Sequence, residues 1–272
     1  MVNYIKTRLL SVKLIICFVM LLVYVQFLFG NAVIGQNMLD AKEAYVLMVN
    51  SKSSMVLYIM CMVIAMMYPS KNNAMYILRF GKRRWVRSEL YSLILMIVIF
   101  QMMVALACFV WFPRLEADTW SPVFLAASLI NADYYDMNIG MVYRFMGWIL
   151  FSKPMTVFAI SFVLHVLLGI VIAVICLYCN LYLRAGYGLF AGFALFGMSD
   201  VIIVLNHVFG QSGRVNKIVS LFLLYDHAYI GNLSNGSAGG TLSVTSCMII
   251  YLGFIMLLSV CVIDKSGKIE VT

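Results

Sequence analysis

Charged side chains are scarce in this sequence. Asp, Glu, Lys and Arg make up only 11% of the 272 residues, whereas 64% of the residues are hydrophobic. A water-soluble domain carries about 25% charged and roughly 45–50% apolar residues. This chain has too few charges to cover a water-facing surface. Its composition therefore excludes a soluble globular protein and predicts a membrane protein.

Motifs of common enzymes are also missing. The chain contains no HExxH zinc motif and no GxSxG serine-nucleophile motif. It lacks GxxxxGK[ST], so it has no phosphate-binding loop and cannot hydrolyse ATP by itself. We therefore expect no catalytic residue in this chain, and neither a metal nor a cofactor bound by it.

Cysteine is confined to the apolar stretches. All seven cysteines lie there and none sits in a long polar loop, which argues against a disulfide framework. Cys176 and Cys179 form a CxxC, a spacing that also occurs in redox and metal sites. They lie one helical turn apart near the end of an apolar stretch, without a second cysteine pair. We favour packing of free thiols as their role.

Long apolar runs make up most of the chain. A helix needs about 20 apolar residues to cross a bilayer, and lipid cannot satisfy the backbone of an open strand. We predict an all-α, polytopic fold: one transmembrane domain with six spans. Their approximate ranges are 14–30, 50–68, 90–111, 157–179, 187–205 and 242–263. The second apolar run by itself covers only 55–68; its span is expected to begin earlier than that, because 44–50 is also apolar and only Ser51–Ser54 interrupts it.

The distribution of charge orients these spans. Lys and Arg concentrate in cytoplasmic segments near membrane helices. With the N-terminus inside, the cytoplasmic side holds twelve of the 19 Lys and Arg residues but only three of the 11 acids. We therefore expect a multi-pass protein of the cell membrane with both termini cytoplasmic. The net charge of +8 then reflects topology, and nucleic acid is not expected as a partner.

Three connections between the spans are distinctive. Segment 69–89 is the only long cytoplasmic connection, and it contains Gly81 as a helix stop or hinge. The outer loop 112–153 is rich in aromatic and acidic residues, and it is too long for a simple turn. Segment 217–230 is apolar but interrupted by polar residues, which is typical of a re-entrant or interfacial segment.

Few polar groups lie within the predicted spans. Ionisable residues there are functional candidates because burying them in lipid is costly. Asp200 in the fifth span and His165 in the fourth are the clearest cases. A lone His on an apolar helix is usually a packed, hydrogen-bonded residue, so we expect a structural role for His165. Gly188 and Gly192 form a GxxxG, which lets another helix approach closely.

A basic cluster is the most specific feature of the sequence. Residues 77–90 read ILRFGKRRWVRSEL, with five cations between apolar stretches. Membrane topology, anionic lipid headgroups or a cytoplasmic protein partner would each explain it. The stretch 76–94, in which Arg-Phe-Gly and further cations lead into the third span, resembles the permease subunits of the second ABC exporter superfamily. The six-span layout agrees with that family over the whole chain.

The resemblance implies a function and partners. In that family the connection between helices two and three docks on a separate subunit that binds ATP and Mg and hydrolyses the ATP. This chain would be the permease of an ATP-driven exporter for a hydrophobic or amphipathic substrate, such as a peptide or lipid-like molecule. It would pair with a second copy or a sister permease, among membrane lipids. The docking residues would be Asn72, Asn73, Arg79, Lys82, Arg83, Arg84, Trp85 and Arg87.

Two other functional classes stay open. A gradient-driven secondary transporter would place protonation of Asp200 at its centre. A non-transporting immunity or sensory membrane protein would move no substrate. The family also carries a re-entrant element between helices five and six, which would match 217–230. The outer loop is larger than a minimal family member needs, which leaves an added partner or a gating role open.

Overall fold

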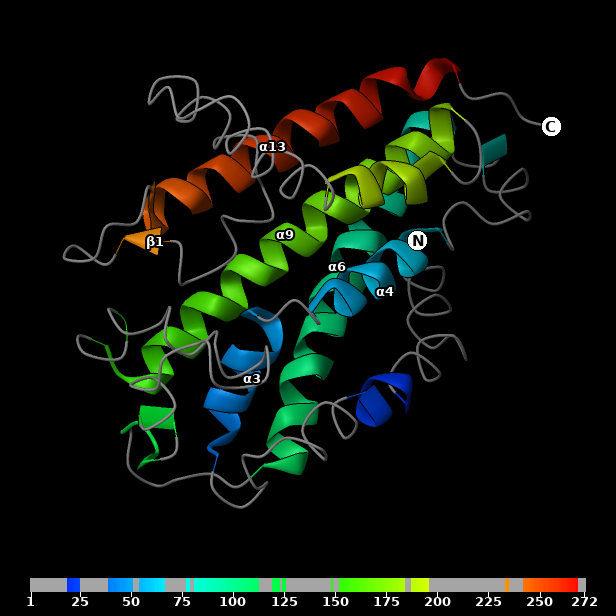
Figure 1. Ribbon diagram of the computed structural model, residues 1–272. Coiled ribbons are helices and arrows are strands. Elements are labelled where there is room, and N and C mark those ends of the chain that lie inside the picture. The colour runs from blue at the N-terminus through cyan, green and yellow to red at the C-terminus, as the bar shows by residue number, and fades with distance from the viewer. Residues whose placement is uncertain are drawn as a thin grey trace, which may run out of the picture.

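The fold is mainly helical where the structure, a computed structural model, describes the chain (Figure 1). The described residues are 19–24, 39–50, 54–66, 77–78, 81–112, 119–122, 124–125, 148, 152–183, 187–195, 233–234 and 242–268. The main helices are α3 (Ala41–Asn50), α4 (Ser54–Met66), α6 (Lys82–Trp111), α9 (Pro154–Tyr182) and α13 (Val244–Asp264), followed by the 3-10 turn η4 (Lys265–Lys268). One parallel pair of two-residue strands, β1 (Leu233–Ser234) and β2 (Leu242–Ser243), is the exception to the predicted all-α fold.

Three helices in the described ranges are long and apolar enough to cross a membrane. They are α6, α9 and α13, which correspond to the predicted third, fourth and sixth spans. Their presence agrees with the prediction of a membrane protein. The helix boundaries differ from the predicted spans: α9 extends three residues further at each end, and the starts of α6 and α13 also differ. Helix α6 begins at Lys82, because the basic stretch is itself helical, and α13 begins at Val244, because Leu242–Ser243 forms β2.

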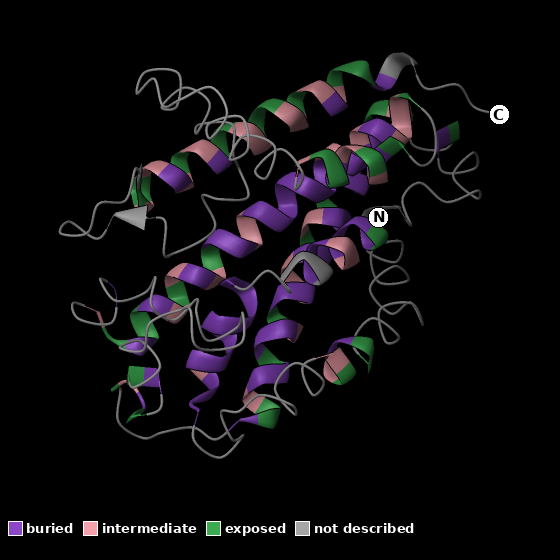
Figure 2. Cartoon of the chain, viewed as in Figure 1, coloured by how far each residue is buried: buried purple, intermediate pink, exposed green. Residues whose placement is uncertain are grey.

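Helix α9 is the centre of the bundle. It packs against α3, α4, α6 and α13 (Figure 1). It is buried along much of its length, whereas α13 buries only Cys247, Tyr251 and Val262 (Figure 2). A helix that is apolar on all sides is suited to such a central position, because every face meets another apolar surface.

The contacts of α9 give the relative directions of the long helices. Phe109, near the end of α6, lies with its ring centroid 5.7 Å from that of Phe158, near the start of α9, so these two helices are antiparallel. The hydroxyl of Tyr182 donates to the carbonyl of Val262, and Lys265 donates to the hydroxyl of Tyr178. Helices α9 and α13 therefore run in the same direction and end together.

Helices α3 and α4 pack along α9 and run in the same direction as α9. Their contacts proceed in order, from Tyr45 with Phe158 (ring centroids 4.9 Å apart), through Asn50 with Ser161 (Nδ2 to Oγ, 3.3 Å), to Tyr58 with His165 (ring centroids 6.1 Å apart). The apolar segment 44–50 thus does precede the second predicted span along the same path. It belongs, however, to a separate helix rather than to an extension of α4.

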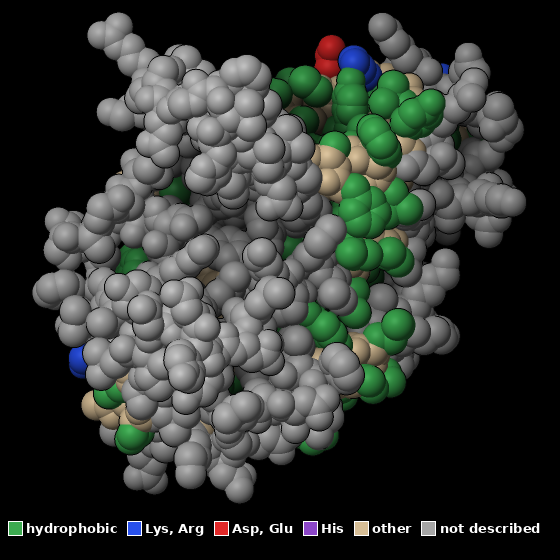
Figure 3. Space-filling view, in the orientation of Figure 1, with side chains coloured by type: hydrophobic (Ala, Val, Ile, Leu, Met, Phe, Trp, Pro, Cys, Tyr) green, Lys and Arg blue, Asp and Glu red, His purple; other side chains and the backbone are tan. Residues whose placement is uncertain are grey.

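The outside of the bundle is apolar. Hydrophobic side chains gather in a band down the right-hand part of the view, and charged side chains are seen at the upper end of this band (Figure 3). On α13, Ile249, Met256 and Val260 are each 65% exposed. A soluble monomer rarely exposes apolar surface in this way, whereas a helix in a bilayer meets lipid there.

Candidate functional site

The basic cluster is organised around Gly81, which precedes α6. Gly81 has φ 78° and ψ 149°, a conformation that residues with a Cβ rarely adopt. Its N–H donates to the carbonyl of Ile77 (2.9 Å), and its own carbonyl accepts from the N–H of Trp85 (3.1 Å). Gly81 therefore closes the helical turn that contains residues 77–78 and opens α6, as expected of a stop or hinge.

The first two turns of α6 have two distinct faces. Arg83, Arg84 and Arg87 are exposed, while Trp85 (3% exposed) and Glu89 (0%) are buried. The reason is helical spacing, since positions 85 and 89 are four residues apart and share one side of the helix. The three arginines therefore form a basic face, the name used below for Arg83, Arg84 and Arg87.

The basic face lies at the end of the bundle where α9 and α13 finish. Helix α6 contacts η4, and its antiparallel course along α9 places its start beside the ends of α9 and α13 (Figure 1). Trp85 and Lys82 differ from the arginines. Trp85 is buried and anchors the start of α6, and Lys82 is only partly exposed. The other expected docking residues, Asn72, Asn73 and Arg79, lie outside the described residues.

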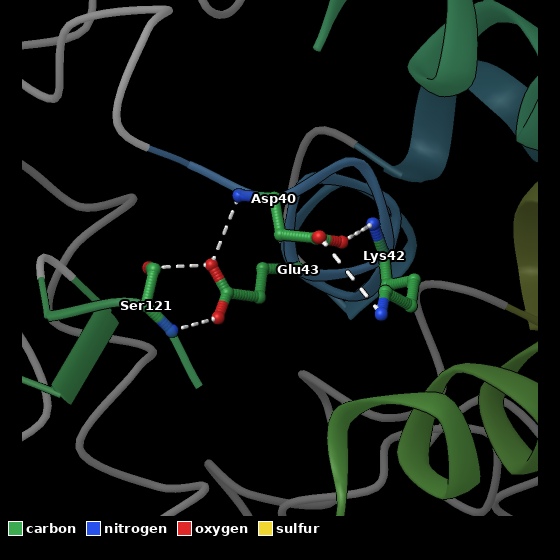
Figure 4. A network of polar contacts seen from close by, with 4 residues as sticks. All are labelled: Asp40, Lys42, Glu43 and Ser121. Atoms are coloured by element: carbon green, nitrogen blue, oxygen red, sulfur yellow. Dashed lines mark hydrogen bonds and ion pairs between the residues drawn. The ribbon is translucent and has the colours of Figure 1, made fainter. Parts of the chain in front are cut away.

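The opposite end of the bundle contains a buried carboxylate, that of Glu43 (Figure 4). Its Oε1 accepts from the N–H of Ser121 (2.6 Å), and its Oε2 accepts from the hydroxyl of Ser121 (2.6 Å) and the N–H of Asp40 (3.1 Å). Glu43 is fully buried, and Ser121 is 1% exposed. The side chain thus fastens the start of α3 to a chain segment 78 residues further on. We call this set of contacts the Glu43 clamp.

The Glu43 clamp joins two helical N-termini. Asp40 caps α3, because its Oδ1 accepts from the N–H of Lys42 (2.7 Å), and Glu43 reaches back three residues to Asp40. Ser121 caps the short helical segment that follows it, because its hydroxyl accepts from the N–H of Phe124 (3.2 Å). Burial raises the pKa of Glu43 above its ordinary value of 4.5, and the hydrogen bonds from Ser121 and Asp40 oppose that rise.

This role of Glu43, which is one of the acids placed outside the cytoplasmic side, was not predicted from the sequence. A local signal was present, because Asp40 and Glu43 have the D-x-x-E spacing of a capping box ahead of an apolar helix. The partner Ser121 had no such signal. Its position opposite Glu43 depends on how the end of α6 returns to the start of α3.

His165 is a structural residue of the helix core. It is 1% exposed, and its Nδ1 lies 2.7 Å from the carbonyl oxygen of Ser161. A carbonyl only accepts, so Nδ1 carries a proton. The hydroxyl of Ser161 accepts from Asn50, and the ring of Tyr58 stacks on that of His165. His165 therefore belongs to a polar contact among α3, α4 and α9.

The two glycines of the GxxxG lie in the helical residues 187–195 and contact different helices. A Cβ at Gly188 would lie 2.8 Å from the carbonyl oxygen of Cys176 in α9, whereas a Cβ at Gly192 would meet the side chain of Met62 in α4. The thiol of Cys176 also donates to the carbonyl of Gly188 (3.1 Å). The absence of a side chain at both positions lets residues 187–195 approach the bundle closely.

The described residues contain no group of His, Cys, Asp and Glu that could hold a metal ion. Asp200, the other intramembrane candidate, is outside the part of the chain that the structure describes, as is segment 217–230. Comparison with protein-family models, curated proteins and solved structures finds no match for this chain. The function must therefore be argued from the residues and their geometry.

Proposed function

We propose that this chain is the membrane-spanning permease subunit of an ATP-driven exporter, with ATP and Mg bound by a separate subunit. It crosses the cell membrane six times with both termini in the cytoplasm, and it works with a second copy or a sister permease. Its substrate is hydrophobic or amphipathic, such as a peptide or lipid-like molecule. The sequence basis is the resemblance of 76–94, together with the absence of a phosphate-binding loop.

The helix directions support this topology. Helices α9 and α13 run the same way, so a chain that crosses the membrane with both must cross an odd number of further times between Leu183 and Ser243. Residues 187–195 begin such a crossing. Gly188 lies beside Cys176, near the end of α9. Gly192 lies beside Met62 of α4, and the neighbouring Cys61 faces Gly169, which comes earlier in α9. Residues 187–195 therefore run back along α9, away from its end.

The basic face is the observation that carries the proposal. Three arginines are exposed together at the end of a membrane helix, while Trp85 and Glu89 hold the opposite side of the same turns in the bundle. A rigid, positively charged surface at this end fits an acidic groove on a cytoplasmic subunit. Charge complementarity of this kind sets the rate and specificity of docking.

The test reverses the charge of the basic face. We expect Arg83→Glu with Arg84→Glu to abolish co-purification of the ATP-binding subunit when the two proteins are expressed together. Single exposed ion pairs contribute only about 0.2–1 kcal/mol, so one substitution is too weak a test. The double change adds like-charge repulsion, which costs several kcal/mol at an interface. The measurement is the ratio of ATP-binding subunit to permease after purification.

Two controls separate docking from membrane insertion. Lys153→Glu reverses an exposed charge at the opposite end of the bundle, just before α9, and should leave the ratio unchanged. Accessibility of engineered cysteines in both end regions reports the orientation of the double variant. Correct orientation with lost ATP-binding subunit supports the proposal. Correct orientation with full recovery of that subunit and unchanged transport would refute it.

A further inference from the structure

A groove of about 490 Å³ runs between α6 and α9, on the outside of the bundle. Its lining includes Met102, Ala105, Leu106 and Phe109 of α6, and Phe158 and Phe162 of α9. Ala105 provides the depth, because it is 8% exposed while Met102 and Leu106 on either side are 57% and 51% exposed. The phenylalanines give a firm wall: the rings of Phe158 and Phe162 stack with centroids 6.3 Å apart.

The groove opens where α6 faces lipid. The exposed large hydrophobic residues along α6 are Tyr91, Leu95, Met102, Leu106, Val110 and Trp111. Tyr91 and Trp111 are the aromatic residues at the two ends of this series, and at 1.5 Å per residue they lie about 30 Å apart, the thickness of the hydrocarbon core. Residues 102–109 lie within about 15 Å of the Trp111 end. Ile99, the remaining α6 residue of the lining, lies about 18 Å from that end, so most of the groove is in one leaflet, the one away from the basic face.

The chemistry of the lining selects its occupant. The lining side chains are Ile, Met, Ala, Leu and Phe, so none of them offers a nitrogen or oxygen to a ligand. A peptide segment would bring an N–H and a C=O per residue that this surface cannot satisfy. A partner helix packs best on small residues that allow backbones to approach, and large side chains form this groove. A hydrocarbon chain has no polar group that would lose hydrogen bonds in this groove, and the flexible methionine side chains adapt to its shape.

We propose that this groove is a binding site for one acyl chain of a membrane phospholipid. The chain lies over Ala105, between the rim residues Met102 and Leu106 of α6 and the phenylalanine wall of α9. This is a defined site, distinct from the general layer of lipid around the protein, because the chain enters a hollow over Ala105, which is 8% exposed, between two helices, whereas Ile249, Met256 and Val260 of α13 are each 65% exposed to their surroundings. The proposal requires only that α6 and α9 lie in a bilayer, and it does not depend on an ATP-driven partner.

The test uses the full chain in phosphatidylcholine nanodiscs that contain a trace of phosphatidylcholine with a diazirine on one acyl chain. After illumination, mass spectrometry measures how much label each helix carries. We expect residues 99–109 of α6 to carry severalfold more label than residues 249–260 of α13, which are also exposed and apolar. Equal labelling of the two helices would mean an ordinary lipid layer and would overturn the proposal.

Substitutions in the groove sharpen the measurement. Ala105→Phe fills the hollow and should reduce labelling of α6 to the level of α13. Leu257→Phe, at a 61% exposed position of α13, adds an aromatic ring to lipid-facing surface and should change nothing. If Ala105→Phe does not fold, Ala105→Leu fills less space and serves the same purpose. Unchanged labelling in a folded Ala105 variant, or weaker labelling of wild-type α6 than of α13 because a protein surface covers the groove, would also overturn it.

Discussion

Replacing Glu43 with Ala is expected to lower the free energy of unfolding by on the order of 3–5 kcal/mol. Three donors, namely the N–H and O–H of Ser121 and the N–H of Asp40, would lose their acceptor in a buried place. Each buried donor left without a partner costs about 1–3 kcal/mol, and water entering the vacated space recovers part of this. Denaturation of the purified protein in detergent, followed by circular dichroism, measures the loss.

Lys42→Ala is the matched control for this prediction. Lys42 is on the same turn of α3 and lies 3.9 Å from Asp40, but its side chain is partly exposed. At 3.9 Å this ion pair is at the limit of contact, and removing Lys42 leaves the acceptors of all three donors in place, so the control should lose less stability than Glu43→Ala. If Lys42→Ala and Glu43→Ala are equally destabilised, the Glu43 clamp does not hold this end of the bundle together.

The same carboxylate gives the expected destabilisation a pH dependence, which Glu43→Gln isolates. Because burial raises the pKa of Glu43, the folded chain binds this proton more tightly than the unfolded chain does. The part of the stability that comes from this tighter proton binding is therefore full below about pH 4.5 and is lost as pH rises through the raised pKa. The excess stability of the wild type over Glu43→Gln should fall as pH increases from about 4. A difference that grows with pH would contradict the assigned shift.

The membrane helices of this fold are readable from the sequence because they depend on local composition. A run of apolar residues long enough to cross a bilayer identifies α6, α9 and α13 without any knowledge of their neighbours. The same rule misplaces the start of α6 by leaving out the basic stretch at 82–89. That stretch is helical because it alternates buried and exposed faces, a pattern that hydrophobicity counting does not detect.

The candidate sites depend more on tertiary packing, and the sequence reveals them less completely. The three arginines and Trp85 belong to one cluster in the sequence, but helical spacing sends Trp85 and Glu89 into the bundle and leaves the arginines outside. His165 was correctly expected to be a packed residue with hydrogen bonds. Its neighbours Asn50 and Tyr58 come from two other helices, and nothing local in the sequence selects them.

Gly188→Ala is expected to lower the free energy of unfolding by about 1–3 kcal/mol, near the upper end of that range. The added carbon would lie 2.8 Å from the carbonyl oxygen of Cys176 and 2.8 Å from Oδ1 of Asn180. A backbone oxygen cannot turn aside as a flexible side chain can, so residues 187–195 would have to move away from α9. The same movement would lengthen the hydrogen bond from the thiol of Cys176 to the carbonyl of Gly188.

Two glycine substitutions elsewhere show whether the loss comes from this contact. At Gly253 in α13 an added Cβ meets no atom within 4 Å, and Ala is a better helix former than Gly by about 1 kcal/mol, so Gly253→Ala should be neutral or stabilising. Gly192→Ala should cost less than Gly188→Ala, because the side chain of Met62 can rotate to make room. Thermal unfolding of the three variants in one detergent orders them. A Gly188→Ala protein as stable as Gly253→Ala would show that residues 187–195 do not pack on α9, which would remove the support they give to a further membrane crossing between α9 and α13.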